Sequence, residues 1–172
     1  MNADGSRQRR LALGIVSFSV VWSPDGQKML FERPNPRHHP HSPVPDFPED
    51  LHVMNADGSG KRRLARAGWT SGGPDWSPDG SKIAFAGRAA PLDQEEGVFV
   101  MNADGSERRR LTQRGGSPSW SPDGEWIAYE SGTPGKLPQE IWVMRPDGKA
   151  ARRLIRTDGG ALSPWAWSPA QK

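Results

Sequence analysis

The sequence predicts an all-β fold built from repeated, four-stranded antiparallel sheets, and three observations predict it. Two turn motifs alternate strictly along the chain: W-S-P-D-G begins at Trp22, Trp76 and Trp120, and M-N-A-D-G-S begins at Met1, Met54 and Met101. Short apolar runs of strand length lie between these motifs. The 20 glycines, 17 prolines and eight tryptophans, with a net charge of only +3, indicate a folded, turn-rich chain. Repetition at this spacing predicts a partial β-propeller of about three blades with terminal half-blades.

Degenerate copies extend both motifs toward the end of the chain. W-S-P-A-Q begins at Trp167, and M-R-P-D-G-K begins at Met144. The tryptophans at positions 22, 76, 120 and 167 therefore lie 54, 44 and 47 residues apart. Such intervals are typical of propeller blades, each of which is one supersecondary unit.

Each repeat predicts four strands in a fixed order. The first carries the tryptophan, and the S-P-D-G turn leads to a second strand at 28–31, 82–85 or 126–129. The third strand covers 51–54, 98–101 or 141–144, and an Asp-Gly turn leads to an arginine-rich fourth strand such as 108–112. Apolar residues alternate onto both faces, as blades packed side by side require.

This order predicts a single partial propeller over 1–172. The expected parts are a half-blade at 1–12, blades at 22–66, 76–113 and 120–156, a closing strand at 161–168 and a Pro/His-rich inserted loop at 32–50. The tryptophans expected to pack between blades are Trp22, Trp76, Trp120 and Trp167.

The aspartates of both turns recur, and repeated carboxylates could indicate a calcium or catalytic array. Only one recurs per turn, whereas calcium takes about six to eight oxygens. An aspartate before glycine more often caps its own turn. We therefore interpret the following residues as structural turns: Asp25, Gly26, Asp79, Gly80, Asp123, Gly124, Asp57, Gly58, Asp104, Gly105, Asp147 and Gly148.

Arginines recur on the predicted fourth strands, at 9–10, 62–63, 108–110 and 152–153. Such a basic band could bind nucleic acid or another anionic polymer. Charge on an outermost strand also discourages edge-to-edge pairing, and no aromatic residues interleave with these arginines. We favour an outer rim and expect no nucleic-acid partner.

The insert holds Arg37 and three of the four histidines, His38, His39 and His41. Close imidazoles could capture a transition metal, but a Pro-rich segment offers no scaffold to fix ligand geometry. We expect no metal there and instead a loop that contacts a partner. His52 is expected to be a half-buried packing residue on a strand.

The chain shows no sequence signature of catalysis. It lacks a G-x-S-x-G elbow, an H-E-x-x-H pair and a phosphate-binding glycine loop, so we expect no enzyme and no cofactor. Cysteine is absent, which excludes disulfides and thiolate metal sites. No apolar run approaches the roughly 20 residues of a membrane helix, and residues 1–10 do not form a signal peptide.

The order W-S-P-D-G, strand, strand ending M-N-A-D-G, then R-R-L-T resembles the WD-like propeller repeat of the TolB family. The resemblance implies the C-terminal part of a TolB-type propeller from a bacterium, with a periplasmic full-length parent. We expect the propeller to be incomplete at its N-terminus and to have an authentic C-terminus.

The resemblance also implies a non-catalytic scaffold that binds a protein partner through blade loops. An alternative is the propeller portion of a larger hydrolase or peptidase, where it would gate or orient substrate. A third hypothesis is carbohydrate or anion binding in the channel. A homodimer that completes the ring is a further expectation, because an open propeller exposes apolar blade faces.

Overall fold

The computed structural model describes residues 20–34, 49–68, 73–88, 96–132, 139–158 and 166–168. The expected half-blade at 1–12, the histidines of the insert and residues 161–165 lie outside these ranges. All regular structure in the described ranges is β-strand, which confirms the predicted fold class. No helix in them is long and apolar enough to cross a membrane.

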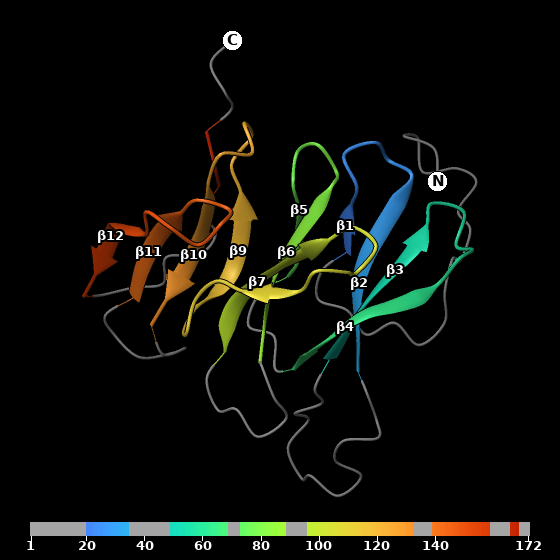
Figure 1. Cartoon of the computed structure of the whole chain (residues 1–172), viewed down its shortest axis with the longest axis horizontal. Helices are drawn as coiled ribbons and strands as arrows, with labels where there is room; N and C mark the ends of the chain where they lie inside the picture. Colours follow the sequence, from blue (N-terminus) through green and yellow to red (C-terminus); the bar gives the residue numbers. More distant parts are fainter. Residues whose placement is uncertain are drawn as a thin grey trace, which may run out of the picture.

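The strands form three antiparallel, four-stranded sheets, each in sequence order (Figure 1). The first sheet contains β1 (Val20–Trp22), β2 (Lys28–Pro34), β3 (Glu49–Asn55) and β4 (Arg62–Gly68). The middle sheet contains β5 (Asp75–Trp76), β6 (Lys82–Gly87), β7 (Gly97–Asn102) and β8 (Arg109–Arg110). The third sheet contains β9 (Gly116–Trp120), β10 (Ile127–Ser131), β11 (Gln139–Met144) and β12 (Arg152–Thr157).

The three sheets stand side by side in the order of the sequence (Figure 1). Their first strands β1, β5 and β9 are neighbours in space, and the fourth strands β4, β8 and β12 form the opposite edges. Because successive strands are antiparallel, both Asp-Gly turns of a sheet lie at one end, and the connection between its second and third strands lies at the other. This arrangement is that of consecutive propeller blades.

Two apolar clusters hold the sheets together. Between the first and middle sheets, Leu51 and Val53 pack with Trp76 and Phe85. Between the middle and third sheets, the second cluster consists of Ala84, Val98, Val100, Trp120, Ile127, Tyr129 and Met144. The middle sheet is therefore buried on both faces, because alternate residues of one strand project to opposite neighbours.

The insert between the second and third strands is shorter than the expected 32–50. Residues 32–34 continue β2 and residues 49–50 begin β3, with Glu32 opposite Leu51 and Arg33 opposite Asp50. The apolar pattern stops at Phe31, but backbone hydrogen bonds extend the ladder through charged residues. Arg63 on β4 also pairs with Asp50, at 3.1 Å, which gives this carboxylate a partner.

The fourth strand of the middle sheet is shorter than the predicted 108–112 and covers only Arg109–Arg110. The backbone N–H groups of Leu111 and Thr112 both donate to the carbonyl oxygen of Val98. The Thr112 hydroxyl accepts a hydrogen bond from the Val98 backbone N–H, at 2.9 Å. These bonds hold the segment beside β7 but end the regular ladder.

Candidate interaction surface

The W-S-P-D-G turns are closed by a serine–aspartate pair. In the middle sheet, the Ser77 hydroxyl donates to Asp79 at 2.6 Å, and the same carboxylate accepts the Ser81 backbone N–H at 3.0 Å. The Lys82 backbone N–H donates to the Ser77 hydroxyl at 2.8 Å. Gly80 ends the turn at a φ of 69°, a conformation that favours glycine.

The other two copies of this turn have the same bonds. The Ser23 hydroxyl donates to Asp25, and the Ser121 hydroxyl donates to Asp123. The motif serine is buried in all three sheets. Only the aspartate and glycine of this turn were expected to be structural, although the recurrence of serine at Ser23, Ser77 and Ser121 was a visible signal.

Hydrogen bonds keep these aspartates in the charged form. The serine hydroxyl, followed by a backbone N–H, lowers the pKa of Asp79 to about 2. The same causes, with the serine hydroxyl first, lower the pKa of Asp25 and Asp123. Each carboxylate thus accepts hydrogen bonds from residues of its own turn. No group of three or more potential metal ligands occurs within the described ranges.

The second set of turns follows the third strands. The carboxylates of Asp57, Asp104 and Asp147 each accept the backbone N–H two residues later. The glycines after them, Gly58, Gly105 and Gly148, have φ values of 87°, 88° and 85°. A residue with positive φ also recurs just beyond each turn, at Gly60, Glu107 and Ala150. Only the first of these is glycine, so sequence could not predict this second position.

The tryptophans mark the junctions between sheets. Trp76 and Trp120 are buried, and the Trp76 indole N–H donates to the Val21 carbonyl on the preceding sheet, at 3.4 Å. The Trp167 indole N–H donates to the Ser119 carbonyl at 3.2 Å. Val21 and Ser119 both directly precede a motif tryptophan. Trp167 therefore contacts the third sheet as Trp76 contacts the first.

Trp22 does not have the expected buried position, because 52% of it is exposed. Its strand belongs to the first described sheet, and it projects to the face that is turned away from the middle sheet, with Met29 opposite it on β2. On that face Met29, Phe31 and Met54 form a small buried cluster, and His52 stacks on Phe31 at a centroid distance of 5.5 Å. His52 is half-buried, and this burial lowers its pKa.

Arginines of the fourth strands connect neighbouring sheets. Arg62 on β4 donates to the Asp104 carbonyl in the middle sheet, at 2.9 Å, and Arg109 on β8 donates to the Pro146 carbonyl in the third sheet, at 3.1 Å. Both acceptors lie in the Asp-Gly turn of the next sheet. The sequence predicted an outer rim but not this bond across the junction.

Arg108 is a second connection between the first and middle sheets. Its guanidinium lies over the rings of Phe99 and Phe85, at 4.6 Å and 5.4 Å from their centroids. It donates to the carbonyl of Arg66 on the first sheet and to that of Arg88, the residue directly after β6. Burial lowers the pKa of this group. The faces of the two phenylalanine rings and the two carbonyl oxygens stabilise the positive charge of this guanidinium.

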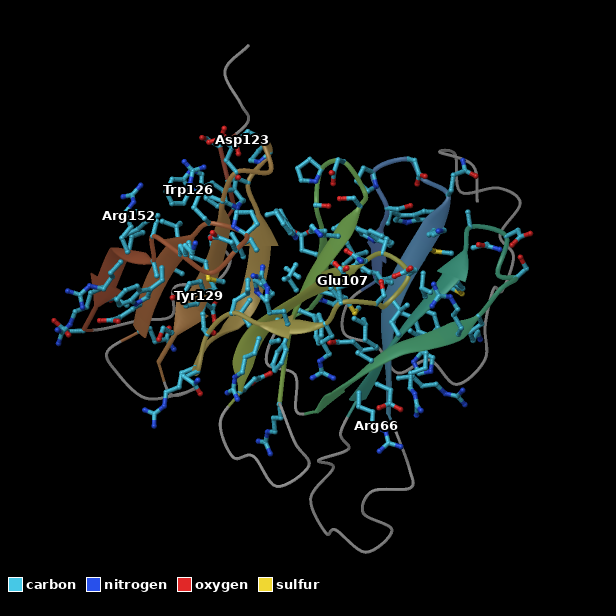
Figure 2. All side chains as sticks on the ribbon, viewed as in Figure 1. Arg66, Glu107, Asp123, Trp126, Tyr129 and Arg152 are labelled. Carbon is cyan, nitrogen blue, oxygen red and sulfur yellow. The ribbon has the colours of Figure 1, made fainter. Side chains whose placement is uncertain are left out.

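Basic side chains of the third sheet contact other residues of the same sheet. Arg145 and Arg152 lie over the Trp126 ring at 4.2 Å and 5.5 Å, and Figure 2 shows Trp126 and Arg152 together on one side of that sheet. Arg153 pairs with Glu140. Many rim guanidiniums are thus engaged within the chain, which favours a structural role for the arginine band.

Asp75 forms a polar bond across the junction between the middle and third sheets. Its carboxylate accepts the Trp120 backbone N–H at 2.7 Å. Burial raises the pKa of Asp75, and the bonds from Trp120 and Ser119 offset only part of that rise. Asp75 directly precedes a motif tryptophan, but the repeat pattern alone does not indicate this role.

Replacing Asp75 by alanine is expected to lower the free energy of unfolding by about 1–3 kcal/mol, because the buried Trp120 N–H loses its acceptor. Replacement by asparagine keeps a side-chain oxygen that can accept this bond and removes the carboxylate charge. Because the pKa of Asp75 is raised in the folded protein, that charge lowers stability once the pH exceeds the pKa of Asp75 in the unfolded chain. The asparagine variant should therefore be at least as stable as the parent protein near neutral pH. Urea unfolding of both variants tests this, and equal losses would contradict the assignment.

A shallow hollow lies between the first two W-S-P-D-G turns. It is lined by Pro24, Asp25 and Lys28 of the first turn and by Pro78 and Asp79 of the second. Pro24 also lies against Gly80, and Pro78 lies against Gly124. The turns thus follow one another along one end of the sheets.

Three successive four-stranded sheets with tryptophan junctions define a protein of the β-propeller class. The family model of the TolB β-propeller domain matches residues 1–172, and the chain belongs to that family. No curated protein sequence matches the chain.

Solved structures share this fold at low sequence identity. The chain is 24% identical to a TolB-type protein of Agrobacterium tumefaciens, with a TM-score of 0.61 over 83% of this chain and 48% of that one. It is 17% identical to TolB of Acinetobacter baumannii, with a TM-score of 0.63 over 84% and 33%. A prolyl endopeptidase is 19% identical, with a TM-score of 0.57 over 81% and 22%. The chain spans about half, or less, of the length of these proteins.

Proposed function

We propose that this chain is part of a non-catalytic propeller scaffold that binds a protein partner through the loop end of its blades. One observation carries the proposal: the two ends of the sheets differ. At the turn end, repeated motifs bond their own polar groups. At the loop end, the connections between second and third strands differ in length, running from Pro34 to Glu49, from Gly87 to Gly97 and from Ser131 to Gln139.

A rigid frame with connections of unequal length is typical of recognition surfaces. The first connection is the longest and contains Arg37, His38, His39 and His41. These residues lie outside the described ranges and remain our candidates for partner contact. Membership of the TolB family supports a protein partner and a place in the bacterial periplasm, as for TolB itself.

The alternative function is that of a propeller joined to a hydrolase or peptidase domain, where it would gate or orient substrate. The observation that favours it is the shared fold with a prolyl endopeptidase, of which this chain covers only 22%. In both proposals the reacting groups, if any, lie outside this chain.

The test replaces residues 35–48 by a short Gly-Ser linker and, as matched control, residues 133–138 by the same linker. Each tagged chain is incubated with periplasmic extract of the source bacterium, cross-linked and purified. We expect one defined protein to be retained by the parent chain and the control but lost by the 35–48 variant. Equal retention by all three chains would contradict the role of the first connection, and an associated catalytic domain would favour the alternative.

A further inference from the structure

Two of the motif tryptophans bond the preceding sheet in the same way. The indole N–H of Trp76 donates to the Val21 carbonyl at 3.4 Å, and the indole N–H of Trp167 donates to the Ser119 carbonyl at 3.2 Å. In both cases the acceptor is the residue directly before the motif tryptophan of the preceding sheet. The repeat thus specifies one hydrogen bond from indole to carbonyl for each junction between sheets.

The junction between the middle and third sheets does not follow this rule. By the same spacing, the Trp120 indole N–H would donate to the carbonyl of Asp75, the residue directly before Trp76. The Trp120 Nε1 atom is instead buried without a hydrogen-bond partner among the described residues. Because a buried donor without an acceptor lowers stability, this exception calls for a physical cause.

The side chain of Asp75 supplies that cause. Its carboxylate accepts the backbone N–H of Trp120 at 2.7 Å. Val21, at the corresponding position of the first sheet, has no side-chain acceptor, and the indole bond forms there. A hydrogen bond to a charged carboxylate is stronger than one between neutral groups. The bond from the Trp120 backbone therefore competes with the indole bond in setting the position of Trp120.

We propose that Asp75 switches this junction between two bonding states. In the charged state, the carboxylate accepts the Trp120 backbone N–H and the indole N–H has no acceptor, as in the structure described here. In the neutral state, the carboxyl group is a weaker acceptor, and the Trp120 indole donates to the Asp75 carbonyl, as the indoles of Trp76 and Trp167 do to theirs. A loss and a gain of similar size separate the two states, so protonation decides between them.

The surroundings of Asp75 leave this control to Asp75 itself. Strand β5 packs against β1, β6 and β9. Neither β1 nor β9 contains a titratable residue, and the lysine of β6, Lys82, donates to Asn102 Oδ1 at 3.1 Å. Burial raises the pKa of Asp75, and hydrogen bonds from Trp120 and Ser119 oppose that rise. The neutral state is therefore reached at a higher pH than for an ordinary aspartate. The proposal is independent of the loop-end partner.

The test is a pH titration of the tryptophan indole N–H signals by proton–nitrogen NMR, in which loss of a signal in Trp120→Phe assigns Trp120. We expect the Trp120 indole proton to move downfield as Asp75 is protonated, while the Trp76 signal stays in place. In Asp75→Asn, the Trp120 signal should already be downfield at neutral pH and should lose its pH dependence. Its exchange with solvent at neutral pH should be at least about tenfold slower than in the parent. The matched control is Asp79→Asn, which removes another carboxylate of the middle sheet, with a pKa of about 2, and should leave the titration of Trp120 unchanged.

Two outcomes would overturn the proposal: a Trp120 indole signal that does not move with pH in the folded parent, or one that still titrates in Asp75→Asn. The dispersion of the spectrum shows at each pH whether the chain is folded. If the parent unfolds in acid before Asp75 is protonated, the comparison at neutral pH decides alone. Identical Trp120 signals and exchange rates in the parent and in Asp75→Asn would then overturn the proposal.

Discussion

Replacing Trp120 by alanine is expected to lower the free energy of unfolding by about 3–5 kcal/mol, the range for truncating a buried aromatic side chain. Trp120 is only 6% exposed and packs with Ile127, Tyr129 and Met144 between the middle and third sheets. Its loss leaves a cavity at a junction that is held from both sides, so the sheets cannot close the gap freely. Urea unfolding followed by circular dichroism gives the difference.

The matched control is Trp22→Ala, because both residues begin a W-S-P-D-G motif. Trp22 is 52% exposed, so its truncation should cost less than half as much as that of Trp120. Similar losses for the two variants would show that the shared motif, rather than burial at the junction, sets the contribution of this residue.

The second large effect is expected for Phe85→Ala, again about 3–5 kcal/mol. Phe85 is 2% exposed, stacks on Phe99 at a centroid distance of 5.6 Å, and contacts the Arg108 guanidinium. Its removal deletes apolar contacts with residues of both the first and the middle sheet. It also leaves the Arg108 guanidinium over the Phe99 ring alone. Faster amide hydrogen exchange should therefore appear in β2 and β3 as well as in β6.

The control at this position is Phe85→Leu, which retains most of the apolar volume and should cost less than about 1.5 kcal/mol. A loss confined to β6 in hydrogen exchange, with β2 and β3 unchanged, would contradict the role of Phe85 between the two sheets. An alanine variant that unfolds at the same urea concentration as the parent would contradict its role in the core.

Much of the fold could be predicted because the turns are encoded locally. Asp-Gly between apolar runs requires a tight reversal with a positive φ at glycine, and Gly26, Gly80 and Gly124 have it. Alternation along the strands predicted two apolar faces, and Ile83 and Phe85 lie in one cluster while Ala84 lies in the other. These features depend on neighbours within a few residues.

Strand ends were less predictable because pairing is decided by the partner strand. β2 continues to Pro34 because β3 offers backbone groups from Glu49 onward, whatever the polarity of the side chains. β8 stops at Arg110 because the next two N–H groups share one carbonyl on β7. The sequence of one segment alone therefore does not determine where its strand ends.

The sequence by itself determined the repeat, the all-β class, the turn positions and the membership of the TolB propeller family. Only the tertiary structure decided the contacts between sheets, which join residues some 40 positions or more apart. Arg62 and Arg152 stand in the same R-R-L segment, yet one bonds the next turn and the other lies over Trp126. Trp22 and Trp120 begin the same motif, yet only Trp120 is buried. The physical reason is that a repeat specifies the same surface each time, while burial depends on which neighbouring sheet covers it.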